Sequence, residues 1–187
     1  MIEITVLKTK VSVSPMFFMV LTAVLLLDKT GISGFAVLFS ILHELGHLLA
    51  LLSQKVYPIS IKTDVFGIHI SLPENLSTEK KCFVLVSGFA VNFILSLLFF
   101  AAGNKIFSYI NLVIGIFTAM PLSSTDGGAV LKTVLFEFIP QKEEKIFKII
   151  SFLFCAAVSV FLAVSIAFTG NYFILIALIY MVLCTMK

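Results

Sequence analysis

The sequence predicts an all-α polytopic membrane protein with six transmembrane helices and a small membrane-associated β-strand or hairpin element. Of its 187 residues, 60% are hydrophobic and 12% charged, and the mean hydropathy is +1.14. A soluble domain is about half apolar and about a quarter charged. Apolar runs near the length of a bilayer crossing recur along the chain, separated by short polar turns. No linker, repeat or low-complexity segment divides residues 1–187, so we expect a single integral membrane domain.

The apolar segments define the expected transmembrane helices. They lie at about 15–27, 32–53, 82–102, 106–120, 149–168 and 172–186. The fourth segment is interrupted at Pro121, and the polar, glycine-rich residues 122–128 are incompatible with an ordinary transmembrane helix. A short amphipathic helix over about 129–139 and a charged loop over 140–148 are expected to lead into the fifth segment.

Two other segments have the pattern of β-strands. Residues 2–13 begin with alternating side chains, which predicts a short strand before the membrane. Residues 55–73 are rich in β-branched side chains and are punctuated by prolines and a glycine, which predicts a hairpin or two short strands. His69 falls in this region and is expected to be an ordinary strand residue.

The basic residues indicate the orientation in the membrane. An even number of spans places both termini on one side, and every lysine except Lys29 and Lys105 falls on that side. The positive-inside rule then predicts cytoplasmic termini. The chain has no arginine and no basic patch with interleaved aromatic residues, so nucleic acid is not an expected partner. The three cysteines are widely separated and imply no disulfide framework.

The second apolar segment contains the sequence His43-Glu44-Leu45-Gly46-His47. Ionisable side chains are disfavoured in lipid and mark a functional site by default. Two histidines four residues apart project from one helix face and can bind one metal ion, and this spacing is that of zinc metalloprotease helices. Glu44 is not needed as a ligand, and its expected role is that of a general base acting on water.

A catalytic zinc ion takes three protein ligands, so the motif predicts a third ligand elsewhere. Asp126 is the outstanding candidate because it follows the interruption at Pro121 at a similar predicted depth in the cytoplasmic half of the membrane. The alternative is that Asp126 simply occupies a turn before Gly127 and Gly128.

Taken together, these motifs resemble the site-2 protease family of intramembrane zinc metalloproteases. The family's second signature is Asn-x-x-Pro-x-x-x-x-Asp-Gly, which Pro121, Asp126 and Gly127 match, whereas Thr118 stands at the asparagine position. Gly88 and Asn92 fit the Gly-x-x-x-Asn pattern of the third span. The resemblance extends over nearly the whole chain. The chain is most similar to the short bacterial sporulation-protease branch. Neither a C-terminal CBS domain nor a PDZ domain is expected in it.

The resemblance implies a zinc-dependent endopeptidase that cleaves a membrane-tethered substrate, such as a pro-sigma or anti-sigma factor, in regulated intramembrane proteolysis. His43, His47 and Asp126 would bind Zn²⁺, and Glu44 would be the catalytic residue. Asn92, with Gly88, would contact substrate or stabilise the oxyanion, and the alternative for Asn92 is an interhelical hydrogen bond. The expected partners are the substrate, the bilayer and a regulatory membrane protein.

Two other functions use the same residues. A metal transporter or metal sensor would bind the ion without cleaving peptides, although a transport path would place polar residues along more than one span. An inactive relative would serve as a binding scaffold, but the intact Glu44 argues against it.

Overall fold

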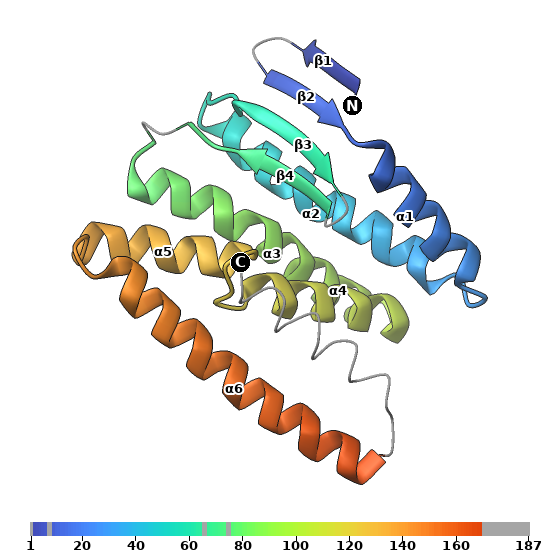
Figure 1. Ribbon diagram of the computed structural model, residues 1–187. Coiled ribbons are helices and arrows are strands. Elements are labelled where there is room, and N and C mark those ends of the chain that lie inside the picture. Colours follow the sequence, from blue (N-terminus) through green and yellow to red (C-terminus); the bar gives the residue numbers. More distant parts are fainter. Residues whose placement is uncertain (1, 7–8, 65–66, 74–75, 170–187) are drawn as a thin grey trace. The chain divides into compact units, whose positions relative to one another are not determined.

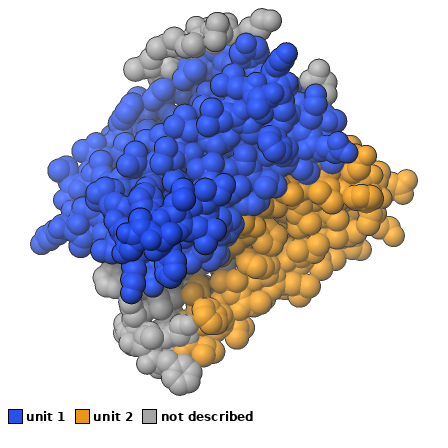
Figure 2. All heavy atoms as spheres, turned by 180° about the vertical axis from the view of Figure 1, so that it is seen from behind, with its two compact units in different colours: residues 1–116 blue, residues 117–187 orange. Residues whose placement is uncertain are grey.

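A computed structural model describes residues 2–6, 9–64, 67–73 and 76–169, and its elements are labelled in Figure 1. The chain divides into two compact units, Met1–Ile116 and Phe117–Lys187, which are coloured separately in Figure 2. The sixth expected span, at about 172–186, lies outside the described residues.

The first unit contains a four-stranded sheet in the order β1 (Ile2–Val6), β2 (Thr9–Val13), β3 (Ser60–Asp64) and β4 (Gly67–Ser71). The outer pairs are antiparallel, and β2 runs parallel to β3. The expected hairpin is confirmed as β3 and β4, with His69 opposite Lys62. The single strand expected over residues 2–13 is wrong in number, because two strands pair there. Alternation continues on both sides of a chain reversal and therefore does not reveal it.

The helices of the first unit are α1 (Pro15–Leu27), α2 (Ile32–Ser53), α3 (Thr78–Ala101) and most of α4 (Lys105–Ala119). These boundaries agree with the first four expected spans, except that α3 begins four residues earlier, directly after its N-cap Ser77. Asp28 fixes the beginning of α2, because its carboxylate accepts hydrogen bonds from the backbone of Thr30 at 2.7 Å and Ser33 at 2.6 Å. Hydrogen bonds from Thr30 and Ser33 hold the pKa of Asp28 well below its usual range.

Helices α2 and α3 pack closely because glycines line their contact. A Cβ atom built on Gly46 would lie 2.9 Å from Cγ2 of Val91 and 3.0 Å from the carbonyl oxygen of Ser87. The buried residues of α3 recur every four positions, as Val84, Gly88, Asn92 and Ser96. This stripe meets the face of α2 that carries both histidines. The helix pair therefore forms the framework of the candidate site.

The second unit contains α5 (Asp126–Phe138) and α6 (Glu143–Thr169). Leu122, fully buried, packs with Cys155 of α6, and the hydroxyl of Ser151 donates a 2.6 Å hydrogen bond to the carbonyl of Pro121. Two expected boundaries are wrong. Helix α5 begins at Asp126 rather than near 129, because Thr125 caps it, and α6 begins within the expected charged loop. Helices extend past apolar segments where flanking polar residues also favour helix.

Among the described residues, three helical segments are long and apolar enough to cross a membrane: Ile32–Ser53, Thr78–Ala101 and Glu143–Leu162. Helices α1 and α4 are shorter and also apolar. Large apolar side chains cover the outer surfaces of these helices. Examples are Leu26 of α1 at 80% exposure, Leu97 of α3 at 70% and Phe152 of α6 at 71%. Exposed apolar surface on this scale fits lipid contact. The expected class, helical with a small β element in a membrane, is confirmed, while the number of crossings stays a prediction.

Candidate metal centre

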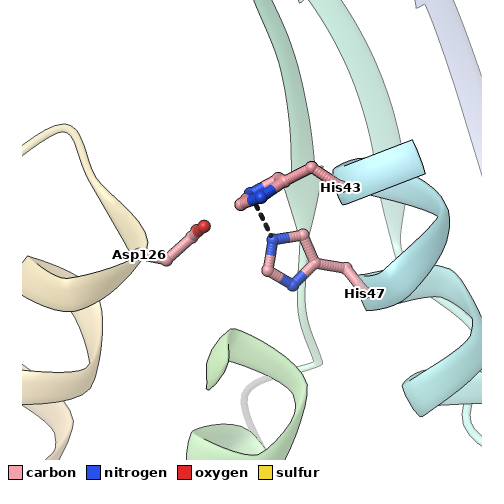
Figure 3. Close-up of side chains that lie close together, drawn as sticks. All are labelled: His43, His47 and Asp126. Carbon is pink, nitrogen blue, oxygen red and sulfur yellow. Dashed lines mark hydrogen bonds between the residues drawn. The ribbon is translucent and has the colours of Figure 1, made fainter. Parts of the chain in front are cut away.

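His43 and His47 lie on one face of α2 and are nearly inaccessible, with exposures of 4% and 5%. Their Nε2 atoms are 3.2 Å apart, the pair joined by the dashed line in Figure 3. The four-residue spacing brings the two rings together on the helix, as the sequence predicted.

Helix α3 supplies an acceptor for the Nδ1 atom of each ring. His43 Nδ1 lies 2.8 Å from Oδ1 of Asn92, and His47 Nδ1 lies 2.7 Å from the backbone carbonyl oxygen of Val84. A carbonyl oxygen only accepts, so each Nδ1 carries the hydrogen and donates it. Each Nε2 then presents its lone pair, and the two lone pairs converge.

Two converging lone pairs suit a cation. Zinc binds histidine nitrogen at about 2.0–2.1 Å, and two ligands in a tetrahedral arrangement then lie about 3.3–3.4 Å apart. The observed Nε2 separation of 3.2 Å is close to that value. Metal-bound histidines usually donate their second N–H to an oxygen, as both rings do here. The residues present therefore fit a zinc ion.

Gly88 of α3 makes room for these imidazoles. A Cβ atom built on Gly88 would collide with Nε2 and Cε1 of His47 and would lie 2.7 Å from Nε2 of His43. The sequence suggested a substrate-binding role for Gly88. Its position instead accounts for glycine by space, because any side chain would enter the region where the two Nε2 atoms converge.

Glu44 follows His43 on α2 and is half-buried. Its role as a general base acting on water stays a prediction.

Asp126 is positioned in the second unit by the turn that precedes α5. The hydroxyl of Thr125 accepts a 3.3 Å hydrogen bond from the backbone nitrogen of Gly128, which caps the helix. Cβ atoms on Gly127 and Gly128 would collide with the carbonyl oxygens of Ala119 and Leu122. The glycines therefore let the turn fold against the first residues of α5, and Asp126 is held half-buried at its start.

Asn92, expected at the substrate or the oxyanion, has hydrogen-bond partners within the first unit. It is fully buried, and its amide nitrogen lies 3.2 Å from Oδ1 of Asn111 in α4. Asn111 is not among the site residues that the sequence motifs predict. A signal was present, because an amide in an apolar segment needs a partner. Thr118 lies in the last turn of α4, and His69 lies in β4 as expected.

The fold is that of a known structure. The site-2 protease from Methanocaldococcus jannaschii matches with a TM-score of 0.67 and 16% identity, over 98% of this chain and 93% of that chain. The chain has the fold of a site-2 protease. The resemblance drawn from the motifs is therefore confirmed for the fold.

One curated sequence is also similar to part of this chain. A Synechocystis protein named "Putative zinc metalloprotease" is 31% identical over 117 residues. The alignment covers 56% of this chain and 31% of that protein, so the chain spans less than a third of this relative's length. No protein-family model matches the sequence.

Proposed function

We propose that the chain is a zinc-dependent intramembrane endopeptidase of the site-2 protease family. The observation that carries this proposal is the pair of buried imidazoles, with Nε2 atoms 3.2 Å apart, on a helix apolar enough to cross a membrane. Buried ionisable groups in such a helix are costly and mark function. The site-2 protease fold and the partial match to a zinc metalloprotease support the same activity.

Asp126 is proposed as the third ligand. Two imidazoles and a carboxylate form a donor set that holds catalytic zinc in metalloproteases, and these three residues are the candidate ligands drawn in Figure 3. A helix start also favours an acidic residue on electrostatic grounds alone, so the proposal needs a test that separates the two roles.

The residues divide the chemistry between them. When bound, zinc acts as a Lewis acid toward the substrate carbonyl and lowers the pKa of water. His43 and His47 would hold the ion, with their Nδ1 hydrogens directed to α3. Glu44 takes the proton from the attacking water and delivers it to the leaving amine, which completes hydrolysis without a covalent intermediate.

The sheet offers a way to hold an extended substrate. Within the described sheet β4 is an outer strand, bonded to β3 on one side. A membrane helix must unwind locally before its peptide bonds can be cut, and an outer strand can bind such a segment by β-augmentation. We place the substrate strand against β4.

The substrate class follows from the motif resemblance and the predicted topology. Cytoplasmic termini, predicted from the lysines, put the site in the cytoplasmic half of the membrane. The proposed substrates are membrane-tethered proteins such as pro-sigma or anti-sigma factors, as in the sporulation branch. A regulatory membrane protein is a further proposed partner.

Zinc dependence of cleavage tests the function. Purified chain reconstituted with single-span substrates should contain about one zinc ion per chain and cleave within the membrane segment. Removing zinc with a chelator should abolish cleavage, and adding zinc back should restore it. Uptake of zinc ions into vesicles, without any cleavage of the substrate, would instead establish the transporter alternative.

Replacing Asp126 with asparagine tests the third ligand. An amide is a poor zinc ligand, so Asp126→Asn should lower zinc affinity and cleavage at least about 10-fold. The matched control is Glu143→Gln, since Glu143 is a half-buried acidic residue in the first turn of α6. Zinc affinity, measured by chelator competition, should be unchanged in this control. Equal zinc affinity in both variants and the wild type would leave Asp126 with only its electrostatic role at the start of α5.

A further inference from the structure

Behind the candidate metal centre, two buried amides connect α4 to His43. Asn92 and Asn111 are both 0% exposed. Asn111 Oδ1 lies 3.2 Å from Nδ2 of Asn92, and Asn92 Oδ1 lies 2.8 Å from Nδ1 of His43. We call these two side chains the amide chain. Buried amides are costly unless they are hydrogen-bonded, so a fully connected pair in an apolar bundle calls for an explanation.

Backbone carbonyls fix the direction of the amide chain. Asn111 Nδ2 donates a 2.9 Å hydrogen bond to the carbonyl oxygen of Phe107, and Asn92 Nδ2 donates a 3.4 Å bond to that of Phe39. Carbonyl oxygens only accept, so in each amide the nitrogen must face its carbonyl. The oxygen of Asn111 is therefore turned to Asn92, and the oxygen of Asn92 is turned to His43.

The orientation of the Asn92 amide determines whether Nε2 of His43 is free of hydrogen and can bind a metal. An oxygen at Nδ1 requires that His43 carry its hydrogen there, which leaves the lone pair on Nε2. If the Asn92 amide turned over, it would present N–H groups to Nδ1 and favour hydrogen on Nε2, the form that cannot bind metal through that atom. A Cβ atom on Gly115 would lie 3.4 Å from Cβ of Asn92, so α4 also packs closely at this point.

We propose that Asn92 and Asn111 are positioning residues, which together set the tautomer and ring orientation of His43 for metal binding. Asn111 is hydrogen-bonded to Asn92 and acts on His43 through it. The inference rests on the proposed metal-dependent function, and it assigns Asn92 to the metal centre instead of the oxyanion. Outer hydrogen-bond partners of metal-bound histidines typically contribute about 10- to 100-fold to metal affinity.

The test compares zinc affinities of the full-length chain in detergent, measured by chelator competition. Asn111→Leu should bind zinc about 10-fold or more weakly than wild type, and Asn92→Leu at least as weakly. The matched control is Ser96→Ala. Ser96 is also a buried α3 residue bonded to α4, through its 2.9 Å hydrogen bond to the carbonyl of Ser108. This control removes a buried interhelical bond outside the amide chain and should retain wild-type zinc affinity.

A spectroscopic measurement distinguishes positioning from simple stabilisation. With cobalt in place of zinc at saturation, the visible absorption of Asn111→Leu should shift, because His43 is reoriented, whereas Ser96→Ala should give the wild-type spectrum. If Asn111→Leu does not fold, Asn111→Ser removes the amide at lower steric cost and is compared in the same way.

The outcomes separate the two proposals. Zinc affinity and cobalt spectra in the Asn111 variant that match Ser96→Ala would overturn the positioning role while leaving the protease proposal intact. A wild-type chain that binds neither metal would overturn the proposed function and, with it, the inference.

Discussion

Replacing Glu44 with glutamine should abolish peptide cleavage while zinc remains bound. The amide has nearly the same size and can occupy the same half-buried place on α2, but it cannot take a proton from water. A positioned general base contributes about 10²- to 10⁴-fold to a reaction rate, so a loss of at least about 100-fold is expected. Cleavage of a reconstituted single-span substrate and metal analysis of the same preparation measure both effects.

The control for Glu44→Gln is Glu79→Gln, which removes an acidic charge from the exposed first turn of α3. Cleavage by this variant should equal that of the wild type. Wild-type cleavage by Glu44→Gln would refute the general-base assignment. Loss of zinc together with activity would make Glu44 a ligand.

Replacing Gly88 with alanine should disrupt the metal site from the opposite helix. The added methyl group would collide with the His47 imidazole and lie 2.7 Å from Nε2 of His43, so both rings would have to move. Overpacking of this kind costs about 1–3 kcal/mol, which corresponds to a loss of about 5- to 150-fold in zinc affinity. Cleavage should fall at least in proportion.

Two other glycines provide controls for Gly88→Ala. A Cβ atom on Gly34, in α2, would meet only Cδ2 of Leu25 at 3.9 Å, so Gly34→Ala should leave zinc affinity unchanged. Gly46→Ala would press on Val91 and the Ser87 carbonyl and should destabilise the packing of α2 on α3. Zinc affinity in Gly88→Ala equal to that in Gly34→Ala would show that Gly88 does not make room for the metal.

The boundaries of α5 and α6 show where sequence patterns were insufficient. The polar run before α5 predicts a break, whereas Thr125 in it is a helix cap and Asp126 begins the helix. A threonine followed by an acidic residue is a recognised helix start, so this signal was available. For α6, the charged residues after Glu143 belong to the helix, although a span defined by apolar residues alone leaves them in a loop. Hydropathy identifies the part of a helix that lies in lipid, and it does not show where the whole helix begins and ends.

Gly88 and Asn92 show a different limit. The Gly-x-x-x-Asn pattern predicts a substrate or oxyanion role for them only through the family resemblance, which does not describe their contacts. The structure places the Gly88 backbone against both imidazoles and the Asn92 amide on His43. Asn111 was missed altogether, although an amide among apolar residues is itself a signal.

The sequence by itself determined the membrane class and the paired histidines of α2. Both are local properties, since hydropathy is summed along a segment and the helical repeat alone puts residues four apart on one face. Only the tertiary structure decided what lies behind each imidazole: the Val84 carbonyl, the Asn92 amide and, beyond it, Asn111. Those contacts depend on how α3 and α4 are rotated and how closely α3 approaches α2. Many rotations would satisfy the same apolar pattern, and the polar partners and the small residues between the helices select one of them.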